Sequence, residues 1–243
     1  MHPLSKSKLI AYRQCPKRLW LEVHRHDLRE DSAATQARFQ TGYQVNDVAR
    51  RVYDPEEKGA LINVETEGYE GAFARTAKLL ADSRQPVFEA GFKAEGALAF
   101  ADMMLPESDK GQPAWRMVEV KSSASVKDYH HDDLAVQTFV AQAAGVPLKS
   151  VALAHIDTSW VYPGDEDYRG LLTEKDLTAE TFARTEEVRG WIAACLSGCV
   201  TNQDITEHDP PWDGAAKHGL VNKPDKHGLP MPSGLWPSPT NPP

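Results

Sequence analysis

Apolar residues recur with the period of a helix along the first third of the chain. Ser5 or Ser7 can cap a first helix, and a second helix is predicted over residues 33–53. A short strand over 60–65 and a third helix over 69–82 follow. The chain therefore begins with helices and only then supplies a strand.

The middle of the chain changes to the alternation of apolar and polar residues that is typical of strands. Residues 86–105 predict two strands joined near Glu95-Gly96, and residues 114–123 predict a third. A helix capped by Asp133 follows, and then a strand over 150–157. This order predicts a mixed α/β domain with a central sheet flanked by helices.

The end of the chain contains a last predicted helix, over residues 178–198, and then changes character. Nine of the 17 prolines lie between Pro210 and Pro243, with few large apolar residues that could be buried. We expect a single domain over 1–206 and an irregular tail over 207–243. The parts of the domain are a helical N-terminal part (1–58), a core (59–158), and a strand, loop and C-terminal helix (159–206).

Composition is ordinary for a water-soluble globular protein, with 41% hydrophobic and 26% charged residues. No apolar stretch approaches the roughly 20 residues of a membrane helix. The N-terminus has neither the apolar segment nor the cleavage site of a signal peptide. Three cysteines argue against a disulfide framework. We therefore expect a cytoplasmic protein without a membrane partner.

The net charge of −8 hides a basic N-terminus, because residues 1–30 contain seven lysines and arginines and only three acidic residues. Arg13, Lys17 and Arg18 are candidates for contacts with the phosphates of a nucleic acid. A solvated helix face explains the same charges.

The stretch WRMVEVKSS, residues 115–123, places two opposite charges inside an apolar strand. Glu119 and Lys121 point to the same face, because successive side chains of a strand alternate. Asp102 ends the preceding strand, and neighbouring strands lie about 4.8 Å apart. Asp102, Glu119 and the carbonyl oxygen of Val120 therefore form a candidate site for magnesium. Lys121 would then stabilise negative charge on a phosphate or orient a water molecule.

The same residues have a structural interpretation. Burying one charge alone is costly, and Lys121 would pair with the carboxylates of Asp102 and Glu119 without any catalytic role. The spacing of the three residues does not distinguish the two interpretations.

The order of the segments resembles the RecB-type branch of the PD-(D/E)XK nuclease superfamily. The similar members are the exonucleases of CRISPR adaptation and uncharacterised bacterial RecB-like nucleases. The resemblance covers residues 4–158. It rests on five segments, LSKSKLIAYRQCPKRLWLE, GYQVNDVARRVY, FADMM, EVKSS and DDLAVQTFVAQAAGV.

The resemblance implies a restriction-endonuclease-like core and a magnesium- or manganese-dependent deoxyribonuclease. Asp102 and Glu119 would be metal ligands and Lys121 the catalytic lysine. Gln137 would be the glutamine that RecB-type members place near the DNA and the site. Glu89 would occupy an acidic strand position found in some relatives, and an exposed hairpin charge explains it equally well.

The chain departs from the family at three places. Asn46 stands where CRISPR-linked members carry a histidine ligand, and its carbonyl oxygen is a weaker candidate for the metal. Ala141 stands where RecB-type helices often carry a tyrosine. The iron–sulfur cluster of many relatives needs four thiolates, and only Cys15, Cys195 and Cys199 are present.

Two functions remain open at this point. One is a nuclease that acts in DNA repair, recombination or defence, with single-stranded DNA or DNA ends as the favoured substrates. The other is a protein that keeps the nuclease fold without turnover and binds nucleic acid or serves as a scaffold. The tail would also suit a fragment of a larger RecB-like protein.

Overall fold

The computed structural model describes residues 3–25 and 33–198 of the chain. The tail predicted over 207–243 lies outside these residues, as does Cys199. No helix in the described ranges is both long and apolar enough to cross a membrane.

The chain divides into two compact units, which we describe separately. The first unit contains the residues up to Lys6 and Phe39–Gly190, and the second contains Ser7–Arg38 and the residues from Trp191 onward. The single domain expected over 1–206 stays a prediction.

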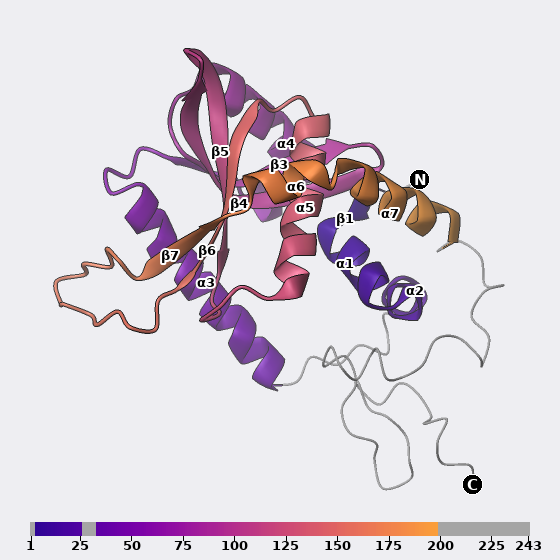
Figure 1. The fold of residues 1–243 in the computed structure, drawn as a ribbon, viewed down its shortest axis with the longest axis horizontal. Coiled ribbons are helices and arrows are strands. Elements are labelled where there is room, and N and C mark those ends of the chain that lie inside the picture. Colours follow the sequence, from indigo (N-terminus) through magenta and orange to yellow (C-terminus); the bar gives the residue numbers. More distant parts are fainter. Residues whose placement is uncertain (1–2, 26–32, 199–243) are drawn as a thin grey trace, which may run out of the picture. The chain divides into compact units, whose positions relative to one another are not determined.

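The first unit is built on a seven-stranded mixed sheet (Figure 1). Its order is β2-β3-β4-β5-β6-β7, and β1 pairs with β4 outside this path. The strands are β1 (Leu4–Ser5), β2 (Ala60–Leu61), β3 (Val87–Ala94), β4 (Ala97–Asp109), β5 (Gln112–Lys121), β6 (Leu148–Ile156) and β7 (Leu172–Asp176). Strands β3, β4 and β5 form an antiparallel meander, whereas β5 and β6 are parallel.

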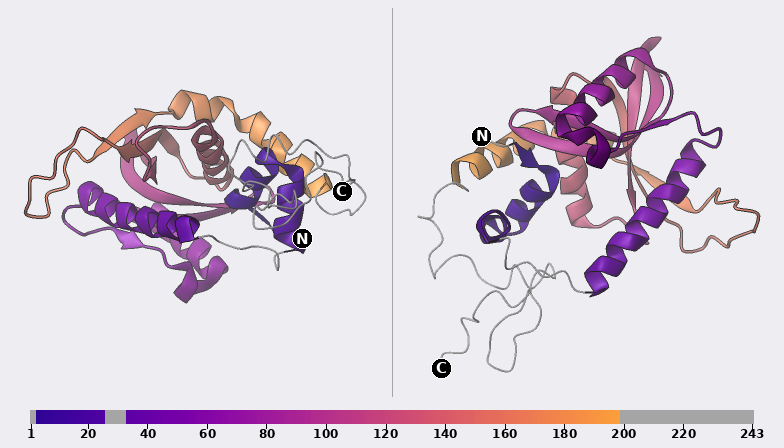
Figure 2. Two further views of the ribbon diagram at one scale, coloured as in Figure 1. Left: turned by 90° about the horizontal axis from the view of Figure 1, so that it is seen from below. Right: turned by 180° about the vertical axis from the view of Figure 1, so that it is seen from behind.

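Helices α3 (Ala33–Tyr53) and α5 (Asp128–Ala143) lie on opposite sides of this sheet (Figure 2). Parallel strands need a crossover connection, and α5 is the crossover between β5 and β6. Ala49 of α3 belongs to a buried cluster whose strand members are Phe88, Met103, Val118, Val120, Ala152 and Ala154. Glu119 and Lys121 alternate with Val118 and Val120 and therefore belong to the face that α5 covers. The predicted mixed α/β fold with helices flanking a central sheet is confirmed.

Local hydrogen bonds move two of the predicted boundaries. Helix α4 (Val64–Asp82) contains the predicted helix over 69–82, but an additional first turn over 64–67 precedes a kink at Gly68, whose φ of 67° and ψ of 168° are not helical. The reason is a cap, because Asn63 Oδ1 accepts hydrogen bonds from the backbone N–H groups of Glu65 at 2.9 Å and Thr66 at 3.2 Å. The strand predicted over 60–65 is correspondingly reduced to Ala60–Leu61.

Two predicted helices are each divided in the structure. The first becomes α1 (Lys6–Gln14) and α2 (Pro16–His24), with Cys15 extended between them, because a proline disfavours the helical conformation of the residue before it. The last becomes α6 (Thr178–Ala183) and α7 (Thr185–Gly198), divided at Arg184.

The cap predicted at Asp133 is wrong. Helix α5 begins at Asp128, with Lys127 as its cap, so Asp133 lies inside the helix. Its carboxylate is therefore available for contacts with the sheet.

Candidate active site

Three neighbouring strands place carboxylates side by side. At this end of the pairing between β4 and β5, the last paired residues are Met103 and Val118. Asp102 and Glu119 are the next residues along their strands, so they lie side by side. Glu89 of β3 lies opposite Asp102, because the residues on either side of Glu89 pair with Met103 and Ala101. We call Glu89, Asp102 and Glu119 the carboxylate row.

Glu119 is the most enclosed member of the row, with a side chain that is 3% exposed. Its Oε1 is 2.7 Å from Lys121 Nζ and 3.0 Å from Lys6 Nζ. Gln137 Nε2 donates a hydrogen bond to Glu119 Oε2 at 2.6 Å. Burial disfavours the charged form of Glu119, but the positive charges of the lysines outweigh it and hold the pKa of Glu119 well below its usual range.

Asp102 has the opposite electrostatic environment. Burial and the negative charge of Glu119 raise the pKa of Asp102 well above its usual value, and the charge of Lys6 compensates only in part. Asp102 Oδ2 accepts a hydrogen bond from the backbone N–H of Val120 at 2.7 Å. Among the described residues, Asp102 Oδ1 has no hydrogen-bond partner. Asp102 is therefore a carboxylate whose burial and repulsion the nearby lysines offset only in part.

Glu89 is in a strained conformation within β3. Its φ is 54°, in the left-handed region that residues other than glycine rarely adopt, and such strain is found most often at functional sites. Burial and the charge of Glu119 raise the pKa of Glu89, while Arg50 and Lys6 lower it. Glu89 is half-buried, so the structure does not support the alternative of an exposed hairpin charge.

Lys121 is held between two carboxylates. Its Nζ is 2.7 Å from Glu119 Oε1 and 2.5 Å from Asp133 Oδ2. Burial disfavours the ammonium form, but the charges of Glu119 and Asp133 outweigh burial and raise the pKa of Lys121. Lys121 is therefore a fixed positive charge at neutral pH.

Two residues of the site were not identified from the sequence. Lys6 Nζ contacts Glu119 and also lies 3.3 Å from Asp133 Oδ1. The basic character of the N-terminus indicated a charged helix face, but nothing in the pattern connected Lys6 with Glu119. Asp133 was interpreted as a helix cap, which hid its contact with Lys121.

Gln137 reaches the site from the middle of α5. Its side chain is fully buried, and its Nε2 also donates to the carbonyl oxygen of Phe100 at 2.9 Å. Gln137 Oε1 has no partner among the described residues. An unpaired acceptor in a buried place is costly and calls for an explanation, which a water molecule or ligand in the site would supply. Ala141, one turn further along α5, is buried.

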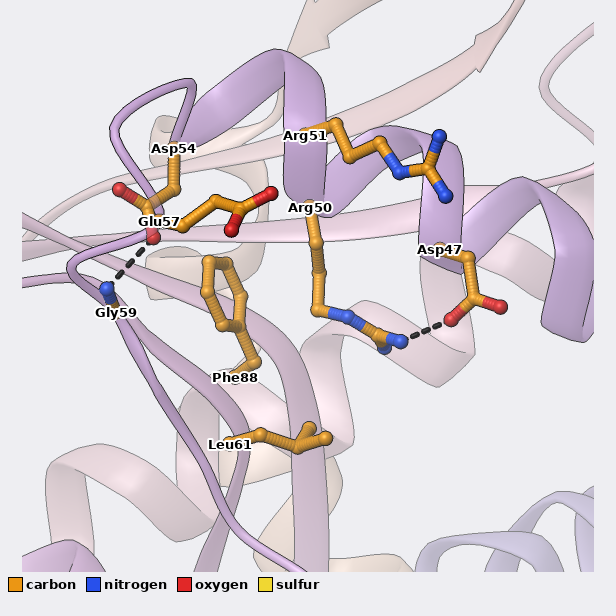
Figure 3. Close-up of a pocket in the computed structure, with 8 residues that line it drawn as sticks. All are labelled: Asp47, Arg50, Arg51, Asp54, Glu57, Gly59, Leu61 and Phe88. Atoms are coloured by element: carbon orange, nitrogen blue, oxygen red, sulfur yellow. Dashed lines mark hydrogen bonds and ion pairs between the residues drawn. The ribbon is translucent and has the colours of Figure 1, made fainter.

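No hydrogen bond between described residues connects Asn46 with the carboxylate row. It lies on α3, which packs against the opposite face of the sheet. The neighbouring Asp47 forms an ion pair with Arg50 in a pocket that Phe88 also lines (Figure 3). The role of Asn46 as a metal ligand stays a prediction.

The predicted phosphate contacts belong to the second unit. Arg18 Nε is 2.7 Å from Glu22 Oε1 on the same helix, and Arg13 stacks 4.2 Å above the centre of the Trp191 ring. Arg13 and Arg18 therefore have partners within their own unit. Lys17 lies beside Arg18 on α2.

Charge reversal tests the N-terminal basic residues as a DNA-binding surface. Changing both Lys17 and Arg18 to glutamate should weaken DNA binding for all sequences and reduce the salt slope of log K by about 2, because each lost phosphate contact releases about one counterion fewer. Reversal of Lys78 and Arg84, two exposed residues of the first unit, changes the net charge equally and serves as the control. A salt slope equal to that of the wild type would exclude this surface.

The cysteines do not supply a cluster within the described residues. Cys15 and Cys195 belong to the second unit, and Cys195 is buried. Because four thiolates are needed, the argument against an iron–sulfur cluster still rests on the cysteine count.

The donor set of the row fits a hard divalent cation. Magnesium is usually held by one or two carboxylates and by waters, and the row supplies Asp102 and Glu119 together with the carbonyl oxygen of Val120. Asp102 uses Oδ2 for its hydrogen bond with the Val120 N–H, so Oδ1 is available to such an ion. The described residues contain no group of three or more His, Cys, Asp or Glu side chains arranged to bind a metal by themselves.

Comparison with known proteins adds little to this geometry. No protein-family model and no curated protein sequence matches the chain. A solved structure described as the crystal structure of SSO0001 is similar with a TM-score of 0.36 and 12% sequence identity, over 85% of this chain and 88% of that chain. A similarity of this size carries no argument about function.

Proposed function

We propose that the protein is a metal-dependent nuclease that hydrolyses phosphodiester bonds of DNA. One observation carries the proposal. Asp102 and Glu119 lie on neighbouring strands, with Lys121 and Gln137 in direct contact with Glu119. The same four residues are those that the RecB-type resemblance implies.

Asp102, Glu119 and the Val120 carbonyl would hold magnesium or manganese. When bound, such an ion supplies Lewis-acid stabilisation of phosphate charge and lowers the pKa of a coordinated water. The protein's part is to orient both carboxylates. The Val120 N–H orients Asp102, and Gln137 orients Glu119.

Lys121 would act as a charge and not as a base. Its raised pKa keeps it protonated at neutral pH, so it cannot accept a proton from water. A fixed ammonium group beside the carboxylates is placed to stabilise negative charge that develops on a phosphate. Asp133 is a positioning residue, because it holds Lys121 from the side opposite to the sheet.

One observation favours the second function, nucleic-acid binding without turnover. Both oxygens of Glu119 have partners in the protein, since two lysines share Oε1 and Gln137 occupies Oε2. A carboxylate satisfied in this way is also what a purely structural ion-pair network contains.

A cleavage assay separates the two functions. Purified protein is incubated with end-labelled single- and double-stranded DNA and manganese, beside a Glu119→Ala variant. We expect manganese-dependent cleavage by the parent protein, faster on single strands or ends, and none by the variant. DNA binding without cleavage would favour the second function, and equal cleavage by both proteins would indicate a contaminating nuclease.

A further inference from the structure

Two lysines and two carboxylates form a closed ring of ion pairs in the site. Lys121 Nζ bridges Glu119 Oε1 at 2.7 Å and Asp133 Oδ2 at 2.5 Å. Lys6 Nζ bridges the same two residues, at 3.0 Å from Glu119 Oε1 and 3.3 Å from Asp133 Oδ1. Each carboxylate therefore faces both ammonium groups. At Glu119, the two ammonium groups share a single oxygen, Oε1.

Lys6 is brought to the ring by the backbone that precedes it. Strand β1 pairs in parallel with β4, with Leu4 opposite Ala97 and Ser5 opposite Leu98. Lys6 follows directly, and its side chain is only 23% exposed. The contacts that hold Lys6 must therefore offset the rotamer entropy that a confined lysine side chain loses.

A divalent cation at Asp102 and Glu119 would meet the ammonium group of Lys6. Lys6 Nζ lies 3.0 Å from Glu119 Oε1, an oxygen that would ligate the metal ion. Lys121 lies in the paired part of β5, opposite His155 of β6, whereas Lys6 follows a strand of only two residues. The contacts of Lys6 with Glu119 and Asp133 are also longer than those of Lys121. Lys6 is therefore the lysine that can be displaced.

We propose that Lys6 is a built-in counter-cation of the metal-free site, which a divalent metal ion displaces from Glu119. Lys121 stays with Asp133 when this happens. The inference rests on the metal site of the proposed function and extends it, because it assigns Lys6 a role in controlling metal affinity. It also explains why both oxygens of Glu119 have partners within the protein.

Amine labelling of the wild-type protein tests the displacement without any substitution. The protein is acylated briefly with and without saturating magnesium, and the modification of Lys6 and Lys8 is measured by peptide mass spectrometry. We expect magnesium to raise the labelling rate of Lys6 several-fold and to leave that of Lys8 unchanged. Unchanged labelling of Lys6, under conditions where calorimetry shows bound metal, would overturn the inference.

Substitution of Lys6 gives an independent test. Lys6→Met removes the competing charge, so calorimetry with manganese should show an affinity about tenfold higher or more, with a lower melting temperature of the metal-free protein. Lys6→Arg, which keeps the charge, and Lys8→Met, two residues away, should bind manganese like the wild type. Lys6→Gln replaces Lys6→Met if the latter does not fold.

The outcomes separate this inference from the proposed function. A wild-type protein that binds manganese and cleaves DNA, with Lys6→Met no tighter in binding, would contradict the role of Lys6 alone. A wild-type protein that binds no divalent metal would contradict both.

Discussion

Lys121→Ala should lower manganese-dependent DNA cleavage by about two or three orders of magnitude, the effect of removing one electrostatic partner of a transition state. Metal affinity should not fall, because Lys121 is a neighbour of the carboxylates and not a ligand. The measurement compares cleavage rates and manganese binding on the same preparation. Lys175→Ala, at an exposed position of β7, is the control.

The ring of ion pairs sharpens this prediction. A broken buried pair ordinarily costs about 3–5 kcal/mol. When Lys121 is removed, Lys6 still bridges Glu119 and Asp133, so the loss of stability should fall below that range. A variant that is strongly destabilised but cleaves like its parent would show that Lys121 is a structural partner only.

Glu119→Gln and Asp102→Asn should both reduce manganese affinity, by about tenfold or more, and should have opposite effects on the metal-free protein. Glu119→Gln removes one of the two carboxylates that Lys6 and Lys121 share and should lower the stability, but by less than about 3–5 kcal/mol, the cost of a fully broken pair, because Asp133 still contacts both lysines. Asp102→Asn removes a carboxylate whose pKa is raised by burial and by Glu119, so it should raise the melting temperature.

The gain from Asp102→Asn should depend on pH. Because the pKa of Asp102 is higher in the folded protein than in the unfolded chain, the wild type loses stability as the pH rises through the folded-state pKa. The asparagine variant is spared this loss, so its advantage should be present above that pKa and should disappear at acidic pH. Thermal melts from pH 4 to pH 8 measure this, with the exposed Asp109→Asn on the same strand as the control. An equal gain in both variants would contradict the assignment.

Local patterns predicted the centre of the site because its residues are close in sequence and regular in structure. The alternation of β5 placed Glu119 and Lys121 on one face, and the antiparallel meander placed Asp102 beside them. Gln137 came from the resemblance to RecB-type nucleases, and the crossover of α5 places it against Glu119.

The remaining site residues depend on contacts that leave no local pattern. Lys6 is 113 positions from Glu119 and reaches it through the two-residue strand β1. The strand expected within 159–206 is β7, but its bounds could not be predicted for a related reason, since it is an edge strand of which only Leu172 is not exposed. An exposed edge strand has no need of the apolar alternation by which strands are recognised.

The central claim is that the carboxylates of β4 and β5 share a divalent cation. The most direct test is an anomalous difference map from crystals of the protein grown with manganese at a concentration that saturates binding by calorimetry. The account predicts a manganese peak in contact with the side chains of both Asp102 and Glu119. A map with no peak at these residues, or with the ion bound elsewhere in the chain, would contradict it.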